Sequence, residues 1–192
     1  EIAVAAAEIK SKIEDINLFF ESEPEISSEK QVLTKISGGI ELCNVSFRYA
    51  DEMPDVIDNI SLKISPGQYV AIVGKTGCGK STLMRLMLGL EKARKGVIYY
   101  DNKDIEKIDL KSLRQKIGVV MQDGKLFHGD ILSNITIASP NIPAEKVWEA
   151  AEIAGIADDI KKMPMGIKTI VSEGSRGISG GQKQRILIAR AI

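Results

Sequence analysis

The sequence predicts an α/β fold, in which strands alternate with helices along the chain. An apolar run at residues 69–73 leads through a glycine-rich segment, 74–81, into a helix-like run. A second apolar run, 117–121, lacks alternating polar residues, which is typical of a central parallel strand buried on both faces. Residues 40–47 and 59–64 alternate apolar and polar residues, which indicates half-exposed strands.

The first element expected is a helix over residues 2–20. Its apolar residues recur at spacings of three and four, so they form one stripe that we expect to pack against a neighbouring element. The stripe consists of Ile2, Ala5, Ala6, Ile9, Ile13, Ile16 and Phe20. The acidic stretch 21–25 contains Pro24, which ends the helix. We expect a disordered or extended path from there to residue 36.

Turn residues separate the elements that follow. Residues 65–67, Ser-Pro-Gly, turn the chain into the run at 69–73, and Asp101 with Asn102 ends a strand at 97–100. Residues 110–116 form a short helix. The next helix opens with Pro143 in its first turn and is closed by Gly155. It carries Val147, Trp148, Ala151 and Ala154 on one face, and we interpret Trp148 as a core or interface residue.

Composition excludes several classes of protein. The 192 residues include 26 Lys+Arg and 26 Asp+Glu, so charge provides no case for a nucleic acid or an anionic membrane surface as partner. The two cysteines, Cys43 and Cys78, suit a reducing cytosol, and the single histidine, His128, excludes a histidine-based metal site. The chain begins at Glu1 without methionine and stops at Ile192 inside a predicted helix. We therefore expect a piece of a longer polypeptide.

The strongest motif is G-x-x-x-x-G-K-S at residues 74–81. Its glycines let successive backbone N–H groups point inward, and the helix start adds a positive dipole end, so we expect a polyphosphate to bind there. Lys80 can reach the β- and γ-phosphates, Ser81 offers a hydroxyl to Mg²⁺, and Thr82 a second hydroxyl near the α-phosphate. A glycine-rich structural turn is the alternative. The predicted nucleotide-binding residues of this loop are Gly74, Lys75, Thr76, Gly77, Cys78, Gly79, Lys80, Ser81 and Thr82.

A second motif, Ile-Ser-Gly-Gly-Gln, occupies residues 178–182. Ser179 is a natural N-cap for a helix that begins at Gly180, and two glycines leave the first N–H groups uncovered. Such a helix start binds anions. A plain glycine-broken helix cap is the alternative.

Together the two motifs resemble the nucleotide-binding domain of ATP-binding-cassette (ABC) transporters over about residues 40–192, although the usual form of the second is L-S-G-G-Q. The resemblance implies an incomplete P-loop NTPase domain at residues 37–192, with a mixed sheet, an antiparallel β subdomain and a helical subdomain. Residues 1–36 resemble a helical connector from a membrane domain, followed by the acidic linker. The implied ligands are ATP and Mg²⁺.

The resemblance also implies partners. In a head-to-tail dimer, residues 179–182 of one copy, which form the family's signature turn, would close over the γ-phosphate held by Lys80 of the other copy. Coupling helices of a transmembrane domain would also contact the domain. The trans-acting signature residues would be Ser179, Gly180, Gly181 and Gln182. The predicted location is the cytoplasmic face of the cell membrane. The second domain of this dimer could be an identical copy or a different ABC domain.

Three further positions match the family. Tyr49 lies where these domains stack an aromatic ring on adenine, although packing is the alternative role. Gln122 follows the run 117–121 and resembles the glutamine that reaches Mg²⁺ and the attacking water; with Lys80 it completes the predicted catalytic pair. Residues 172–177 resemble an exporter segment that contacts coupling helices, or they are simply a glycine-rich loop.

The family's Mg²⁺-supporting Asp, catalytic Glu and switch His would follow residue 192. We therefore expect this piece to bind nucleotide weakly and to hydrolyse little or none by itself. The predicted function is ATP-driven export, and residues 120–135 resemble exporters of bacteriocin-like peptides. Alternatives are a soluble ABC ATPase without transport and a nucleotide-gated dimerisation module.

Overall fold

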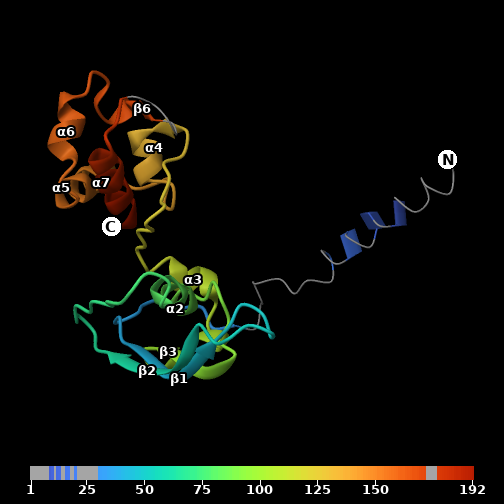
Figure 1. Ribbon diagram of the computed structural model, residues 1–192. Coiled ribbons are helices and arrows are strands. Elements are labelled where there is room, and N and C mark those ends of the chain that lie inside the picture. The colour runs from blue at the N-terminus through green and yellow to red at the C-terminus, as the bar shows by residue number, and fades with distance from the viewer. Residues whose placement is uncertain (1–8, 11, 14–15, 18–19, 21–29, 172–176) are drawn as a thin grey trace. The chain divides into compact units, whose positions relative to one another are not determined.

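A computed structural model describes residues 9–10, 12–13, 16–17, 20, 30–171 and 177–192, in two compact units, 1–112 and 113–192 (Figure 1). The acidic linker predicted at 21–25 and most of the predicted exporter segment, 172–176, lie outside the described residues. The described residues of the first twenty are helical. Their apolar members are at least half exposed: Ile9, Ile13, Ile16 and Phe20.

The first unit contains a four-stranded antiparallel sheet in the order β2-β1-β3-β4. Its strands are β1 (Ile40–Phe47), β2 (Ile57–Ile64), β3 (Lys95–Tyr100) and β4 (Lys103–Asp104). The alternation of β1 places Leu42 in the core and pairs it with Leu62 and Ile98. Asp101 and Asn102 both adopt positive φ, which gives the tight turn between β3 and β4 that their residue types favour.

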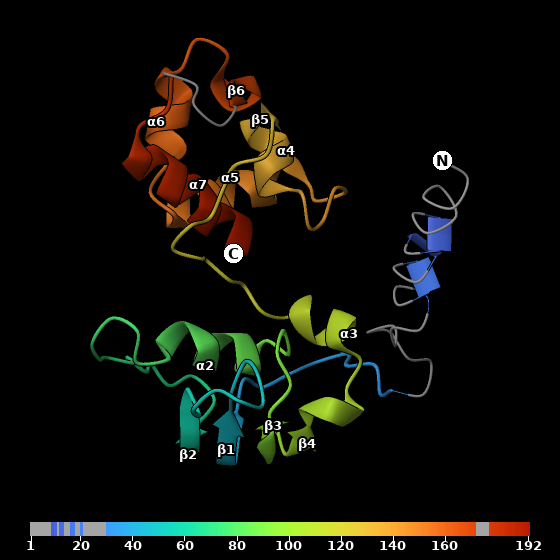
Figure 2. The ribbon, with the colours of Figure 1, turned by 45° about the vertical axis from the view of Figure 1, so that its right-hand side comes forward.

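Helix α2 (Lys80–Met87) lies over one face of this sheet (Figures 1 and 2). It buries Thr82, Leu83 and Leu86, and the Tyr100 hydroxyl at the end of β3 donates a hydrogen bond of 2.7 Å to the Met87 carbonyl. This apolar face holds the start of α2, and with it the phosphate-loop motif, at the sheet. The short helices η1 (Ile105–Lys107) and α3 (Leu110–Arg114) follow β4.

For the chain up to residue 36 the sequence predicted either disorder or an extended path, and residues 30–36 follow an extended path. Gln31 forms a parallel bridge with Ile108. Leu33 is buried, and its N–H donates to the Ser112 hydroxyl at 2.9 Å. This segment is therefore packed on the first unit by one buried apolar side chain and by main-chain hydrogen bonds of Gln31 to Lys107 and Asp109.

Two predicted strands are wrong. Residues 69–73 and 117–121 are not strands in the structure. The first run is exposed throughout, with Tyr69 at 101% and Val73 at 88%, and in the second run Ile117 and Val119 are half-buried. A strand is stable only beside another strand that completes its main-chain hydrogen bonds. Among the described residues, no strand pairs with either run, so apolar composition alone does not produce one.

The second unit is mainly helical. It comprises β5 (Gly129–Asp130), α4 (Ile131–Ile135), α5 (Ala144–Ile153), α6 (Ala157–Lys162), η2 (Gly166–Lys168), β6 (Ile170–Val171) and α7 (Gly180–Ala191). Its core is a cluster of small and branched side chains from α4, α5, α6 and α7. The predicted apolar face of α5 is confirmed, because Val147 and Ala151 are buried in that cluster and Trp148 packs against it.

The ends of α5 differ little from the prediction. The helix begins at Ala144, so Pro143 is its N-cap and not a residue of its first turn. Gly155 ends it with φ of 70°, a conformation that glycine adopts without a Cβ penalty. The N–H groups of Gly155 and Ile156 donate to carbonyls of the last turn at 2.9 Å each, which completes the expected glycine cap.

Candidate nucleotide-binding site

The phosphate-loop motif folds around the ammonium group of Lys80. Gly79 precedes α2 with φ of 92°, and a Cβ there would lie 2.9 Å from Ile57 Cδ1 and 3.0 Å from the Val56 carbonyl oxygen. Only glycine fits this close approach. The Nζ of Lys80 donates to the carbonyls of Gly74 at 2.9 Å and Lys75 at 2.8 Å. A phosphate bound here would replace these carbonyl contacts with contacts to its own oxygens.

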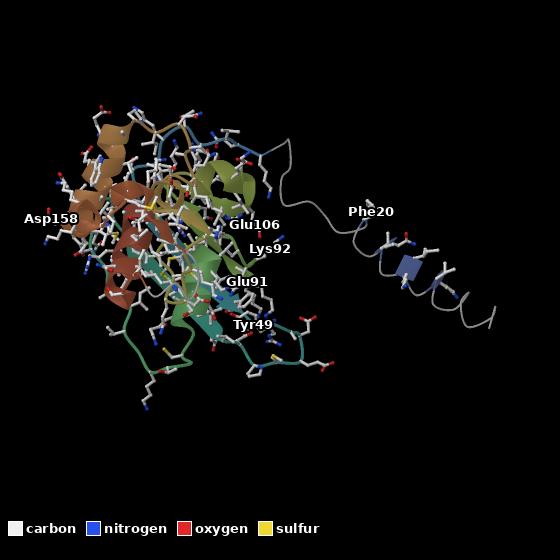
Figure 3. All side chains as sticks on the ribbon, turned by 90° about the horizontal axis from the view of Figure 1, so that it is seen from above. Phe20, Tyr49, Glu91, Lys92, Glu106 and Asp158 are labelled. Carbon is white, nitrogen blue, oxygen red and sulfur yellow. The ribbon has the colours of Figure 1, made fainter. Side chains whose placement is uncertain are left out.

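Tyr49 lies beside the phosphate-loop helix, as the sequence prediction requires. Its hydroxyl is 2.9 Å from the hydroxyl of Thr82, a buried residue of α2. The ring of Tyr49 meets the ring of Phe47 edge-on, with 4.9 Å between centroids and 85° between planes. Tyr49, labelled in Figure 3, nevertheless stays 53% exposed, so part of its side chain is open to a flat partner.

The loop residues also fit a magnesium-bound triphosphate. Ser81 is exposed at the second position of α2, directly after Lys80, so its hydroxyl can serve as an oxygen ligand. Mg²⁺ prefers oxygen ligands and usually shares them with phosphate and water. Ser81 therefore suits the ion that a triphosphate would bring.

The signature turn is a reciprocal helix cap. The predicted N-cap is confirmed: Ser179 Oγ accepts from the N–H of Gln182 at 3.2 Å, and Gln182 Oε1 accepts from the N–H of Ser179 at 3.0 Å. The sequence analysis missed the second half of this box, although Ser-x-x-Gln is a readable signal. A Cβ added at Gly180 would meet no atom within 4 Å, so the space beside the first residue of α7 is open.

Gln122 lies in an exposed turn, in which the Gly124 N–H donates to the Met121 carbonyl at 3.1 Å. The chain after this turn is bound to α7 by Arg190. Its guanidinium donates to the Lys125 carbonyl at 3.1 Å, the Asn134 carbonyl at 2.9 Å and Asn134 Oδ1 at 2.7 Å. Burial lowers the pKa of Arg190.

Asn134 completes this connection between the loop and α4. It is 1% exposed, accepts from the Phe127 N–H at 2.8 Å and donates to the Phe127 carbonyl at 2.9 Å. Sequence reasoning missed Asn134 and Arg190. The local signal was one asparagine between Ser133 and Ile135, which does not identify its partners.

The predicted site residues divide between the two units. Tyr49 and the loop around Lys80 come together in the first unit, whereas Gln122 and the turn at Ser179 belong to the second. The meeting of Gln122 with a nucleotide held by Lys80 stays a prediction. Within the ranges that the structure describes, no helix is both long and apolar enough to cross a bilayer.

Comparison with known proteins settles the family. The family model described as "ABC transporter" matches residues 57–192. The chain belongs to the ABC transporter family. The resemblance stated from the two motifs is thereby confirmed, and the fold is the P-loop ATPase fold of ABC proteins.

Curated relatives of this ABC chain are named for secretion or translocation. It is 42% identical to the cyclolysin secretion/processing ATP-binding protein CyaB of Bordetella pertussis over 88% of the chain and 24% of that protein. It is 44% identical to the alpha-hemolysin translocation ATP-binding protein HlyB of Escherichia coli O157:H7, with the same coverages. The ABC chain thus spans about a quarter of the length of these relatives.

A solved structure agrees with these relatives. A bacterial Atm1-family ABC exporter with ATP bound matches with a TM-score of 0.83 and 32% identity. The match covers 93% of the ABC chain and 32% of that exporter chain. The likeness therefore extends through both described units.

Proposed function

We propose that this chain binds MgATP and that the protein containing it hydrolyses ATP to drive export across a membrane. The observation that carries the proposal is the contact between Tyr49 and Thr82, because it places an exposed aromatic ring next to the helix that opens with Lys80. An adenine ring and a triphosphate need these two features side by side.

The proposed roles follow from the chemistry of each group. Backbone amides of residues 74–82 and the Lys80 ammonium would hold the phosphates, Ser81 would ligate Mg²⁺, and Tyr49 would stack on adenine. Phosphoryl transfer depends on such positioning and on charge stabilisation. Mg²⁺, when bound, neutralises charge that develops on the phosphate oxygens. Gln122 would orient the attacking water.

We propose that the open helix start at Ser179 acts on a second copy of the domain. The capping box engages the Gln182 N–H, and the space beside Gly180 at the first position of α7 is open, which suits the γ-phosphate of a nucleotide bound elsewhere. A head-to-tail pair of domains would use this surface and would transmit closure to coupling helices of a transmembrane domain at the cytoplasmic face of the membrane.

Relatives named for secretion, together with a solved exporter, favour export over a soluble ABC ATPase or a dimerisation module. The relatives' names concern cyclolysin and alpha-hemolysin. We therefore propose a secreted polypeptide as cargo, within which the bacteriocin-like peptide predicted from residues 120–135 is the finer possibility.

Nucleotide binding is tested by thermal unfolding of the full-length protein with and without MgATP. ATP at 100 times its Kd stabilises a single-site protein by about 2.7 kcal/mol. Lys80→Ala should abolish this gain, because the ammonium that would contact the phosphates is lost. Lys63→Ala serves as the control, since Lys63 is an exposed residue of β2. An equal gain in wild type and Lys80→Ala would refute the assignment.

A further inference from the structure

A charged cluster of three residues lies directly beside Tyr49. Asp55 accepts from Arg48 Nε at 2.7 Å through one carboxylate oxygen and from Arg94 Nη2 at 3.0 Å through the other. The Asp55 side chain is only 19% exposed, and hydrogen bonding from Arg48 holds its pKa below the usual range. Asp55 is therefore ionised at neutral pH and joins two guanidinium groups that would otherwise repel each other.

The cluster closes the segment 48–56, which carries Tyr49. Arg48 also donates to the Asp51 carbonyl at 2.8 Å, and the Val56 N–H donates to the Phe47 carbonyl at 2.8 Å. The two ends of the segment are thus bound together where β1 ends and β2 begins. Arg94, just before β3, is fixed to β1 by its N–H, which donates to the Ser46 carbonyl at 2.9 Å, and its guanidinium reaches the segment at Asp55.

The same segment contacts the phosphate loop and its helix through the Tyr49 hydroxyl, 2.9 Å from the Thr82 hydroxyl, and through Val56. The Val56 carbonyl lies at the position that a Cβ of Gly79 would crowd, at 3.0 Å. The Lys80 ammonium, in contrast, is held by carbonyls of its own loop. Loosening segment 48–56 should therefore disturb the ring of Tyr49 more than it disturbs the groups that would hold the phosphates.

We infer that Asp55 is a positioning residue for base recognition: by bridging Arg48 and Arg94 it holds Tyr49 at the orientation in which its ring meets adenine. This inference rests on the proposed ATP binding. Asp55 acts through Tyr49 and does not itself touch the nucleotide. It affects the contribution of the base to affinity and leaves the contribution of the phosphates unchanged.

For Asp55→Asn, electrostatics alone predicts tighter ATP binding, whereas loss of positioning predicts weaker ATP binding. Asp55→Asn removes a negative charge near an anionic ligand, so charge alone would tighten the binding of ATP and tripolyphosphate alike. Loss of positioning weakens ATP and spares tripolyphosphate. The two effects therefore differ in sign and in the ligand that reports them.

The test measures Kd values for ATP and for inorganic tripolyphosphate, both with Mg²⁺, on the purified full-length protein. Base stacking is worth about 1–3 kcal/mol, or about 5- to 150-fold in Kd, so a partly misplaced ring should weaken ATP binding about 3- to 10-fold in Asp55→Asn. Tripolyphosphate binding should change less than about 2-fold. Glu52→Gln is the matched control, because Glu52 is exposed in the same segment and lies outside the cluster.

A double mutant decides whether Asp55 acts through the ring. With Tyr49→Ala already present, Asp55→Asn should add no further loss, since residues that work as a unit are non-additive. Arg94→Gln removes one of the two bridges and should give a smaller loss in the same direction. It replaces Asp55→Asn in the comparison should that variant fail to fold, which the absence of a cooperative thermal unfolding transition would report.

Unchanged or tighter ATP binding in Asp55→Asn would overturn the inference while leaving the proposed function intact. So would an equal loss for ATP and tripolyphosphate, or additive losses in the double mutant. If the wild-type protein bound neither ligand, the proposed function would fail first, and the inference with it.

Discussion

Tyr100 shows how one buried polar group connects two elements. Its ring is 3% exposed at the end of β3, and its hydroxyl donates to the last carbonyl of α2. Burial raises the pKa of Tyr100 to about 12, above the ordinary tyrosine value of about 10. The folded protein thus holds the neutral phenol, and its stability is complete below pH ~10 and falls as pH rises from there towards ~12.

We predict that Tyr100→Phe lowers the free energy of unfolding by about 1 kcal/mol at pH 7, because the Met87 carbonyl loses its donor. The same variant should lose less stability than wild type between pH 9 and pH 11, since no phenol remains to ionise. Urea unfolding at the two pH values measures both effects. Tyr69→Phe is the control, because Tyr69 is fully exposed at 101%; matching alkaline curves for wild type and Tyr100→Phe would contradict the prediction.

At the scale of elements, Arg190 connects α7 to α4 and to the loop after Gln122. Three hydrogen bonds reach Lys125 and Asn134, and the guanidinium lies 5.2 Å from the ring of Phe127. The helix that begins at the signature turn is thus joined to the segment that carries the predicted catalytic glutamine. A planar guanidinium with five donors suits this arrangement, whereas an ammonium group does not.

We predict that Arg190→Ala lowers the free energy of unfolding by about 1–3 kcal/mol, because buried acceptors of Asn134 lose their partner. Arg190→Lys should recover less than half of the loss. Chemical denaturation followed by Trp148 fluorescence reports on the second unit, in which that residue packs. Gln184→Ala, at an exposed position of α7, is the control; equal midpoints for the two alanine variants would disprove the connection.

Local signals in the sequence predicted about half of the elements correctly, whereas the helices α4 and α6 were not predicted. The cap at Ser179, the glycine end of α5 at Gly155 and strand β1 each depend on residues a few positions apart, so the chain itself contains the information. The runs at 69–73 and 117–121 were misjudged for the converse reason. A buried strand forms only where neighbouring strands complete its main-chain hydrogen bonds, and apolar composition does not specify those neighbours.

At the scale of the whole molecule, the two units hold different parts of the predicted nucleotide chemistry. Tyr49 and Lys80 belong to one, and Gln122 and the Ser179 turn to the other. A pair of domains arranged head to tail would bring the turn of one copy to the phosphate loop of its partner. Cys78, exposed within that loop, offers a natural reporter of such an approach.

We predict that Ser179→Cys, in a Cys43→Ala background, forms an intermolecular disulfide with Cys78 on mild oxidation of the full-length protein. The physical reason is that the proposed pairing places the two side chains on opposite sides of one nucleotide site, within reach once the domains close. Non-reducing electrophoresis detects the linked dimer. Gln184→Cys, farther along α7, should link much less; equal linking from both positions would argue against the head-to-tail pair.

The identity of the family and the proposed phosphate site could be predicted from the chain alone, because both motifs are continuous and depend on backbone shape over a few residues. Only the tertiary structure shows which side chains, distant in the sequence, contact the elements that carry these motifs. Tyr49 meets Thr82 across 33 positions and Arg190 meets Asn134 across 56. Such pairs depend on strand register and on helix packing, which no local pattern specifies.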